Sequence, residues 1–69
     1  MNPGWEMVYS STYAHLAELA KGILEHNEIT CVLRNNQDSA YKPIGEVEVY
    51  VRREDLIQAK YILAQNEIE

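Results

Sequence analysis

The side chains best suited to nucleophilic or metal chemistry in this 69-residue sequence are one cysteine and two histidines. Cys31 lies between Ile29 and Leu33 in a β-prone apolar stretch, where burial would raise the pKa of its thiol and suppress its reactivity. His15 and His26 would share one helix face but lie about 16 Å apart along its axis, at ~1.5 Å per residue. We therefore expect a core cysteine, two solvated histidines and no metal site.

Two glutamates could form a catalytic pair, but their spacing also has a purely structural explanation. Glu46 and Glu48 belong to the alternating segment EVEVYVR, so they would share one strand face about 6–7 Å apart. That spacing is compatible with an acid–base pair, but a solvated strand face explains it equally well. Because the sequence also lacks a Gly-rich phosphate loop and a nucleophile elbow, we expect neither catalytic residues nor a bound cofactor.

The polar segment 35–45, NNQDSAYKPIG, is long for a connection between two strands. A hairpin of this class needs only about two to five residues. The segment is therefore either a flexible excursion or a recognition loop. In the second case, the residues expected to contact a protein partner are Asn36, Asp38, Ser39 and Tyr41. A different possibility is a small ligand, a nucleotide or a metabolite, bound between this loop and the sheet.

Hydrophobic period and turn residues predict the elements that position these side chains. In chain order they are a strand at 5–9, a helix of about fifteen residues that ends near Asn27, strands at 29–33 and 46–52, and a helix at about 54–66. Ser10 or Ser11 is expected as the N-cap of the first helix, and Asn27 as its left-handed C-cap.

This order, β-α-β-β-α, predicts a single α+β domain over residues 1–69. The economical arrangement is a ferredoxin-like split β-α-β unit, a three-stranded sheet with two helices on one face. The sequence stops at Glu69 directly after the second helix, so the last strand of the ferredoxin-like plan is expected to be lacking. The first strand would then lie at an unprotected edge, and bare edges invite pairing.

The second predicted helix has two apolar arcs rather than one. The arc that suits the domain core contains Leu56, Ala59, Ile62 and Leu63. The second stripe contains Ile57, Tyr61, Ala64 and Ile68. Either Ile57 and Tyr61 pack against the first helix while Ile68 frays, or the stripe is a surface for self-association.

The sheet face turned away from the helices is a further candidate interaction surface. If the valines of the third strand face the helices, Tyr50 lies on this open face. The first strand would add one of two sets, either Trp5, Met7 and Tyr9 or Glu6 and Val8. The register of this strand stays open, because either set of side chains in WEMVY could face the helices or the open side of the sheet. An open face with Tyr50 and the aromatic set would be partly apolar and could bind a partner.

The net charge of the chain limits the kinds of molecule that it is expected to bind. Six basic and eleven acidic residues give a net charge of −5, and an acidic surface repels nucleic acids and anionic membranes. No apolar run approaches the ~20 residues of a membrane span, and the N-terminus lacks the pattern of a signal peptide. We expect a cytoplasmic protein that binds neither nucleic acid nor membrane.

Several short patterns, in this order, resemble a known family. They are the strand end VYSS, the helix-to-strand step Leu24, Glu25 and Ile29, the Asn-rich loop, the strand pattern Gly45, Val47 and Val49, and the helix pattern Asp55, Ala59, Ile62 and Leu63. Together they are similar to a small bacterial domain-of-unknown-function family described as putative prokaryotic signal-transducing proteins. The resemblance implies a ferredoxin-like domain related to the PII-type regulators. Those regulators bind nucleotides and touch their targets with a long loop after the second strand, the place that 35–45 occupies here.

No residues match a nucleotide-binding motif of the PII-type regulators, so the resemblance does not carry nucleotide binding over. We expect a small, non-enzymatic regulatory or protein-interaction domain that acts through its loop and apolar surfaces. Its expected partner is a protein or a second copy of the chain, as a homodimer. The alternative is a small-ligand sensor.

Overall fold

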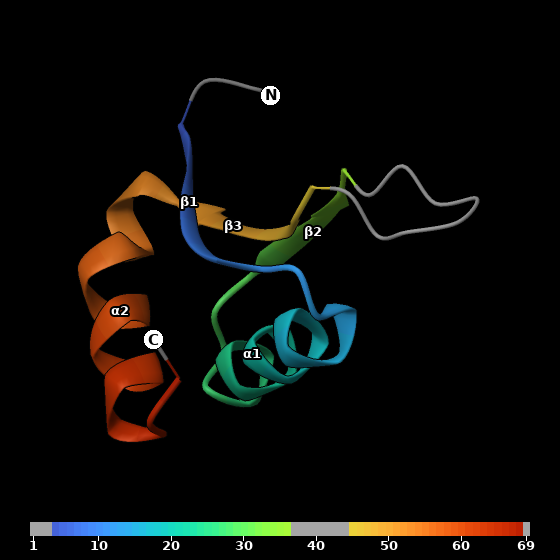
Figure 1. The fold of residues 1–69 in the computed structure, drawn as a ribbon. Helices are drawn as coiled ribbons and strands as arrows, with labels where there is room; N and C mark the ends of the chain where they lie inside the picture. The colour runs from blue at the N-terminus through green and yellow to red at the C-terminus, as the bar shows by residue number, and fades with distance from the viewer. Residues whose placement is uncertain (1–3, 37–44, 69) are drawn as a thin grey trace.

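The computed structural model of the chain describes residues 4–36 and 45–68 (Figure 1). Its elements are β1 (Trp5–Ser11), α1 (Ala14–His26), β2 (Cys31–Asn35), β3 (Val47–Arg52), the 3₁₀ turn η1 (Arg53–Asp55) and α2 (Leu56–Gln65). The predicted order β-α-β-β-α is confirmed. The second helix differs in detail, because one 3₁₀ turn precedes its α-helical part.

The three strands form one antiparallel sheet in the order β1-β3-β2. Both helices lie on one side of this sheet (Figure 1), which gives the predicted α+β, ferredoxin-like arrangement. Within residues 4–36 and 45–68, β3 is the only strand paired with β1, and no strand follows α2. The outer edge of β1 is therefore open in the described part of the chain.

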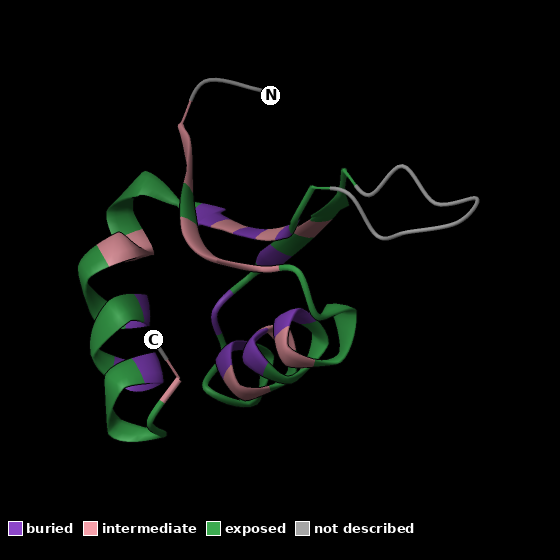
Figure 2. Cartoon of the chain, in the orientation of Figure 1, coloured by how far each residue is buried: buried purple, intermediate pink, exposed green. Residues whose placement is uncertain are grey.

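The core lies between the sheet and the two helices, where Figure 2 shows the buried residues facing inward. Strand β3 contributes Val47, Val49 and Val51, all buried, as its alternation predicts. Opposite them α1 presents Ala17 and Ala20, which have no exposed surface. Such small side chains let the helix approach the sheet closely. The remaining buried apolar residues are Leu24, Ile29, Cys31, Ala59, Ile62 and Leu63.

A β-bulge in β1 explains why neither of the two sets considered for the open face holds along the whole strand. Met7 lies opposite Tyr50 and Tyr9 lies opposite Val49, with Val8 as the extra residue between them. Because residues directly opposite one another point to the same face, Trp5 and Met7 lie on the open face, whereas Tyr9 joins the helix side. Val8 and Tyr9 both pack against the core. A bulge shifts the alternation by one residue, so neither regular set could hold along the strand.

The predicted N-cap of α1 is also wrong, because Ser10 and Ser11 belong to β1. Tyr13 is the N-cap, without a capping hydrogen bond from its side chain. Ser11 still stabilises the turn, since its Oγ accepts a hydrogen bond from the Tyr13 backbone N–H at 3.0 Å.

The two α-helices end in the same way, and this corrects the prediction for Asn27. Its φ is −96°, and the left-handed residue is the following Glu28, with φ 66°. The Glu28 N–H then bonds to the Glu25 carbonyl at 3.0 Å and the Ile29 N–H to the Leu24 carbonyl at 2.9 Å. These bonds form a Schellman motif. They tie Ile29 to the helix end, so the second strand begins at Cys31, two residues later than predicted.

The motif recurs at the end of α2, where the sequence Asn-Glu-Ile appears for a second time, at 66–68. Glu67 has φ 59°, and the Ile68 N–H bonds to the Leu63 carbonyl at 2.9 Å. The apolar residue of a Schellman motif packs back on its helix. Ile68 accordingly packs against the core, and the expectation that it frays was wrong.

Candidate functional site

The outer edge of β1 presents backbone groups that no described strand satisfies. The Arg53 N–H donates to the Gly4 carbonyl at 2.7 Å, so the Gly4 backbone faces β3. Hydrogen-bonded and non-bonded pairs alternate along an antiparallel ladder. The N–H and C=O groups of Trp5 and Met7, opposite Arg52 and Tyr50, therefore point to the open edge. They are available to a further strand.

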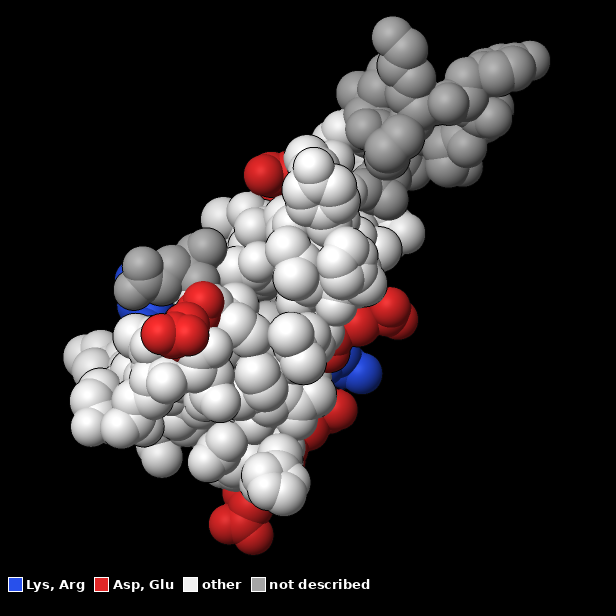
Figure 3. All heavy atoms as spheres, turned by 60° about the horizontal axis from the view of Figure 1, so that its bottom comes forward, with Lys and Arg blue, Asp and Glu red and all other residues white. Residues whose placement is uncertain are grey.

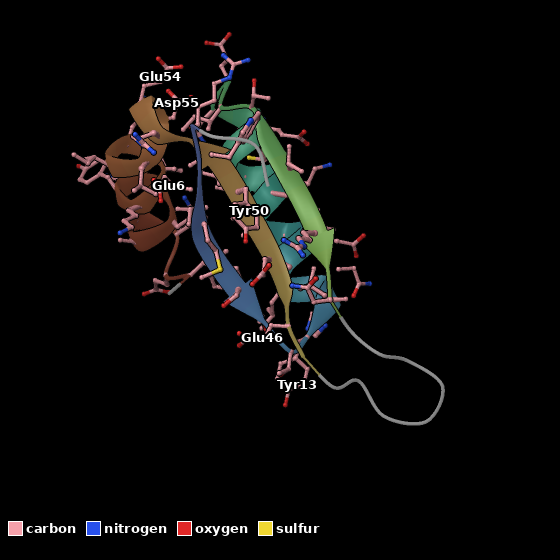
Figure 4. All side chains as sticks on the ribbon, turned by 90° about the horizontal axis from the view of Figure 1, so that it is seen from above. Glu6, Tyr13, Glu46, Tyr50, Glu54 and Asp55 are labelled. Atoms are coloured by element: carbon pink, nitrogen blue, oxygen red, sulfur yellow. The ribbon has the colours of Figure 1, made fainter. Side chains whose placement is uncertain are left out.

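Little on β1 protects this edge from pairing. Charged residues and proline are the usual protection of an edge strand, and β1 carries a single charge, Glu6. That charge already has a partner, because Glu6 Oε1 lies 3.2 Å from Arg53 Nε. The side chains of this pair are 40% and 72% exposed, so the pair adds little to stability. Figure 4 shows Glu6 between β1 and α2.

A groove runs between β1 and α2, beside the open edge. Its volume is about 270 Å³, and it is lined by Val8, Tyr9, Lys60, Leu63, Ala64 and Ile68. Five of these six side chains are aliphatic or aromatic, and Lys60 is the charged one. The groove therefore offers apolar contact together with one cation.

The second apolar stripe of α2 divides between the groove and the outer surface. Ile57 is 86% exposed and Tyr61 is 63% exposed, so the interpretation that they pack against the first helix was wrong. Ala64 is exposed at the groove, whereas Ile68 is half-buried against the core. The Tyr61 hydroxyl accepts a hydrogen bond from Gln65 Nε2 at 3.1 Å, within its own helix. No structure of an assembly tests the self-association predicted for these residues.

The open face of the sheet carries an apolar row across all three strands. Met7, Tyr50 and Val32 lie opposite one another in the register, and Met7 and Val32 are 46% and 39% exposed. Trp5 lies on the same face of β1, opposite Arg52. Figure 4 shows Tyr50 on the middle strand of this face. The predicted partly apolar open face is present, with Trp5 and Met7 as its contribution from β1.

A polar cluster borders this row at the base of the segment 37–44. Glu48 Oε1 accepts hydrogen bonds from Asn36 Nδ2 at 2.8 Å and from the Tyr50 hydroxyl at 3.1 Å. Arg34 Nε donates to Asn36 Oδ1 at 3.1 Å. Glu46, at the end of the sheet in Figure 4, accepts instead from the hydroxyl of Ser10, at 3.3 Å. The two carboxylates considered as an acid–base pair thus have separate partners.

Only one of the four predicted loop contacts can be placed. Asn36 is exposed and belongs to the Glu48 cluster. Asp38, Ser39 and Tyr41 lie outside the described residues. The part of the loop that the structure describes is therefore its base, where the Asn36 N–H bonds to the Glu46 carbonyl at 3.3 Å.

Cys31 is buried, as predicted. Its thiol donates to the Ile29 carbonyl at 3.4 Å. Burial, with a smaller effect of the nearby Glu25 carboxylate, raises the pKa of this thiol to about 11. A thiol with this pKa is protonated and unreactive near neutral pH.

His15 and His26 are exposed on α1, as predicted. Among residues 4–36 and 45–68, no group of three His, Cys, Asp or Glu side chains could hold a metal ion. In the same ranges no helix is long and apolar enough to cross a membrane.

Sequence reasoning missed a second hollow, between α1 and the end of α2. It has a volume of about 370 Å³ and is lined by Glu18, Leu19, Gly22, Ile23, His26, Asn27 and Asn66. Leu19 is 51% exposed there. Gly22 was the sequence signal for this hollow, because a glycine inside an amphipathic helix leaves a gap in the helix surface.

The side of the molecule shown in Figure 3 is mostly uncharged, with its acidic residues towards the margins.

Comparison with protein families adds one finding to this geometry. A family described as "putative prokaryotic signal transducing protein" matches residues 5–67. The chain belongs to this family. The match runs from the first residue of β1 to Glu67, just past the end of α2, so it includes the open edge, the open face and every groove residue except Ile68. Neither the curated proteins nor the solved structures gave a match.

Membership of the signal-transducing family agrees with the resemblance noted in the sequence. The family description concerns signalling and names no enzymatic reaction. It names no ligand and no target, so the surfaces described above are the basis for a more specific function.

Proposed function

We propose that this domain is a non-enzymatic regulatory module that transmits a signal by binding a protein strand at the β1 edge. The observation that carries the proposal is the coincidence of unpaired β1 backbone groups with an apolar groove beside them. An added strand gains backbone hydrogen bonds from such an edge, and side-chain pockets next to it supply specificity. The proposal includes the PII-like mode of action that the resemblance implies, a small cytoplasmic domain that contacts a target.

The small size of the domain also supports strand binding at the β1 edge. A sheet of three strands with two helices buries little apolar surface, and domains this small gain stability from added contacts. Completing the sheet at β1 would cover the groove side chains Val8, Ala64 and Ile68, which the domain itself leaves partly exposed.

The test is photocrosslinking in the native cell with a benzoylphenylalanine residue at one of two lysine positions. Lys60 lines the groove, whereas Lys21 lies on α1 and pairs with Glu25 at 3.7 Å. The proposal predicts a discrete adduct from position 60 that is lost when Met7→Pro blocks the edge, and no adduct from position 21. Met7 suits this block because its N–H points away from β3, where proline is tolerated. Equal adducts from both positions, or an adduct unaffected by Met7→Pro, would contradict it.

A second candidate function is small-ligand sensing between the loop and the sheet, and the Glu48 cluster favours it. Asn36, Arg34 and Tyr50 form a connected set of donors around this carboxylate at the base of the loop. A thermal-shift screen with nucleotides and metabolites tests it, because a ligand that binds only the folded state raises the unfolding midpoint. The midpoint rise should disappear in Glu48→Gln and persist in Lys21→Gln. A screen in which no compound changes the midpoint would contradict this function.

A further inference from the structure

We propose that the strand accepted at the β1 edge is β1 of a second copy, paired antiparallel about a two-fold axis. This inference rests on the proposed function and names its partner. Antiparallel pairing of a strand with its own copy is self-complementary, so it closes at two subunits. It would join two three-stranded sheets into one continuous sheet.

The chemistry of the groove suits this strand. The groove is apolar with one cation, Lys60, and no carboxylate among its lining residues. A basic strand would bring its charge towards Lys60 and be repelled. The sequence of β1, WEMVYSS, is mostly apolar and has Glu6 as its only charge. A second β1 thus brings mostly apolar side chains and no base to a groove that is apolar and already contains one base.

The other sheet edge is less suited to pairing. Strand β2 is shorter than β1, with five residues against seven. It also carries Arg34, which is exposed and held in the polar cluster through Asn36. An edge strand that is short and charged discourages pairing. The symmetric contact therefore belongs at β1.

Pairing at β1 would also complete the open face. Trp5 and Met7 lie on this face at the very edge of the sheet. In the paired form they would meet Trp5 and Met7 of the second copy, which doubles the apolar row that continues to Tyr50. A single copy thus holds half of this surface. Helix α2 lies alongside β1 in Figures 1 and 4, and its Ile57 and Tyr61 side chains are exposed.

The required area is within the reach of these surfaces. A stable interface buries about 800 Å² on each partner, roughly one-sixth of the 4913 Å² that one copy exposes. The unpaired β1 backbone groups would supply hydrogen bonds in that area, and the groove with the exposed Met7, Ile57 and Tyr61 side chains would supply its apolar part.

Net charge predicts an unusual salt dependence for this assembly. Each copy carries −5, so two copies repel each other at long range. Salt screens that repulsion within about 10 Å at 0.1 M ionic strength. Association of two copies should therefore strengthen with added NaCl, whereas association with a basic protein would weaken.

The test is sedimentation equilibrium of the wild-type chain and of two matched variants, Met7→Lys and Val32→Lys. Both residues lie opposite Tyr50 in the same row, one on each edge strand, and both substitutions make the same change in charge. We expect a wild-type dimer that tightens with NaCl, a dissociation constant raised about tenfold or more by Met7→Lys, and a change of less than about twofold in Val32→Lys. Circular dichroism checks that each variant is folded. Should Met7→Lys not fold, the wild-type salt series and Val32→Lys still decide the result.

Three outcomes would overturn the inference. A wild-type chain that remains monomeric at about 1 mM excludes the dimer. Val32→Lys dissociating the dimer as strongly as Met7→Lys shows that the contact is not specific to the β1 edge, and weakening of the dimer by salt contradicts the predicted salt dependence. A monomer that still gives the Lys60 adduct in cells overturns only the identity of the partner. A monomer without that adduct overturns the proposed function as well.

Discussion

Cys31 illustrates how burial determines the reactivity of a side chain that the sequence marks as a candidate nucleophile. Its place between Ile29 and Leu33 was sufficient to predict a core thiol, because the strand predicted at 29–33 puts these three residues on one face. The structure confirms the burial and adds its effect, a thiol pKa raised to about 11. The exposed histidines were equally predictable from the polar side of their helix.

The raised pKa of the Cys31 thiol predicts slow reaction with thiol reagents and a defined pH dependence of the free energy of unfolding. Below pH 9 the thiol is protonated in both the folded and the unfolded chain. Between its ordinary pKa of 9.0 and about 11, the unfolded state loses the proton first, so the free energy of unfolding falls as pH rises. Urea titrations at several pH values should show a steeper loss above pH 9 in the wild type than in Cys31→Ala. Identical slopes, or rapid thiol labelling of the folded chain at pH 7, would contradict the buried thiol.

For the side chains of β1, the sequence could not predict which face of the sheet each one occupies. Alternation placed Val47, Val49 and Val51 correctly, because β3 is a regular strand in the middle of the sheet. It failed for Met7 and Tyr9, since a bulge depends on how β1 meets β3 and not on the local pattern.

At the scale of the elements, the ends of the helices contain a signal that the sequence shows twice. The tripeptide Asn-Glu-Ile closes both α1 and α2 with the same hydrogen bonds, at 27–29 and at 66–68. The positions of the helices themselves followed from their period. The exact ends of the helices could not be predicted, because the left-handed residue that ends each helix is a glutamate. Gly or Asn is the residue usually preferred at that position.

The entry into β3 depends on a glycine, which gives a prediction for this element. Gly45 has φ +95°, and a Cβ at this position would lie 2.8 Å from the Asn36 carbonyl oxygen. Gly45→Ala should therefore lower the free energy of unfolding by about 1–3 kcal/mol, through backbone strain and the close contact.

Urea unfolding of Gly45→Ala measures this loss, and Gly22→Ala is the control. A Cβ at Gly22 meets nothing within 4 Å, and alanine is the better helix former, so that variant should gain stability. Equal stability of Gly45→Ala and the wild type would show that the close approach to Asn36 is not rigid.

At the scale of the whole molecule, the open β1 edge follows from the order of the elements. The order β-α-β-β-α places β1 beside β3 at one side of the sheet, and the sequence was sufficient to predict this. The groove next to that edge was not predictable, because it is lined by Val8 from the bulge together with Lys60 and Ala64 of α2. Only the packing of α2 against β1 brings these residues together.

The exposed stripe of α2 gives a prediction for the assembled molecule. Tyr61→Glu should dissociate the proposed dimer and leave the chain folded, because the side chain is 63% exposed and a buried carboxylate in the interface is costly. Tyr13→Glu is the matched control, since Tyr13, the N-cap of α1, is 62% exposed. Sedimentation and circular dichroism of the two variants provide the readouts. Loss of the fold in Tyr61→Glu, or equal dissociation by both variants, would contradict this role of the stripe.

Amide hydrogen exchange at Trp5 and Met7 tests the completion of the sheet most directly, because these N–H groups point to the open edge and have no partner strand in the described chain. Exchange is followed by NMR at about 20 µM and about 1 mM protein, with the β3-facing amide of Glu6 as an internal reference. If β1 pairs with a second copy, exchange at Trp5 and Met7 should slow about tenfold or more at the higher concentration, while exchange at the Glu6 amide changes much less. Equal exchange rates at the two concentrations for Trp5 and Met7 would contradict it.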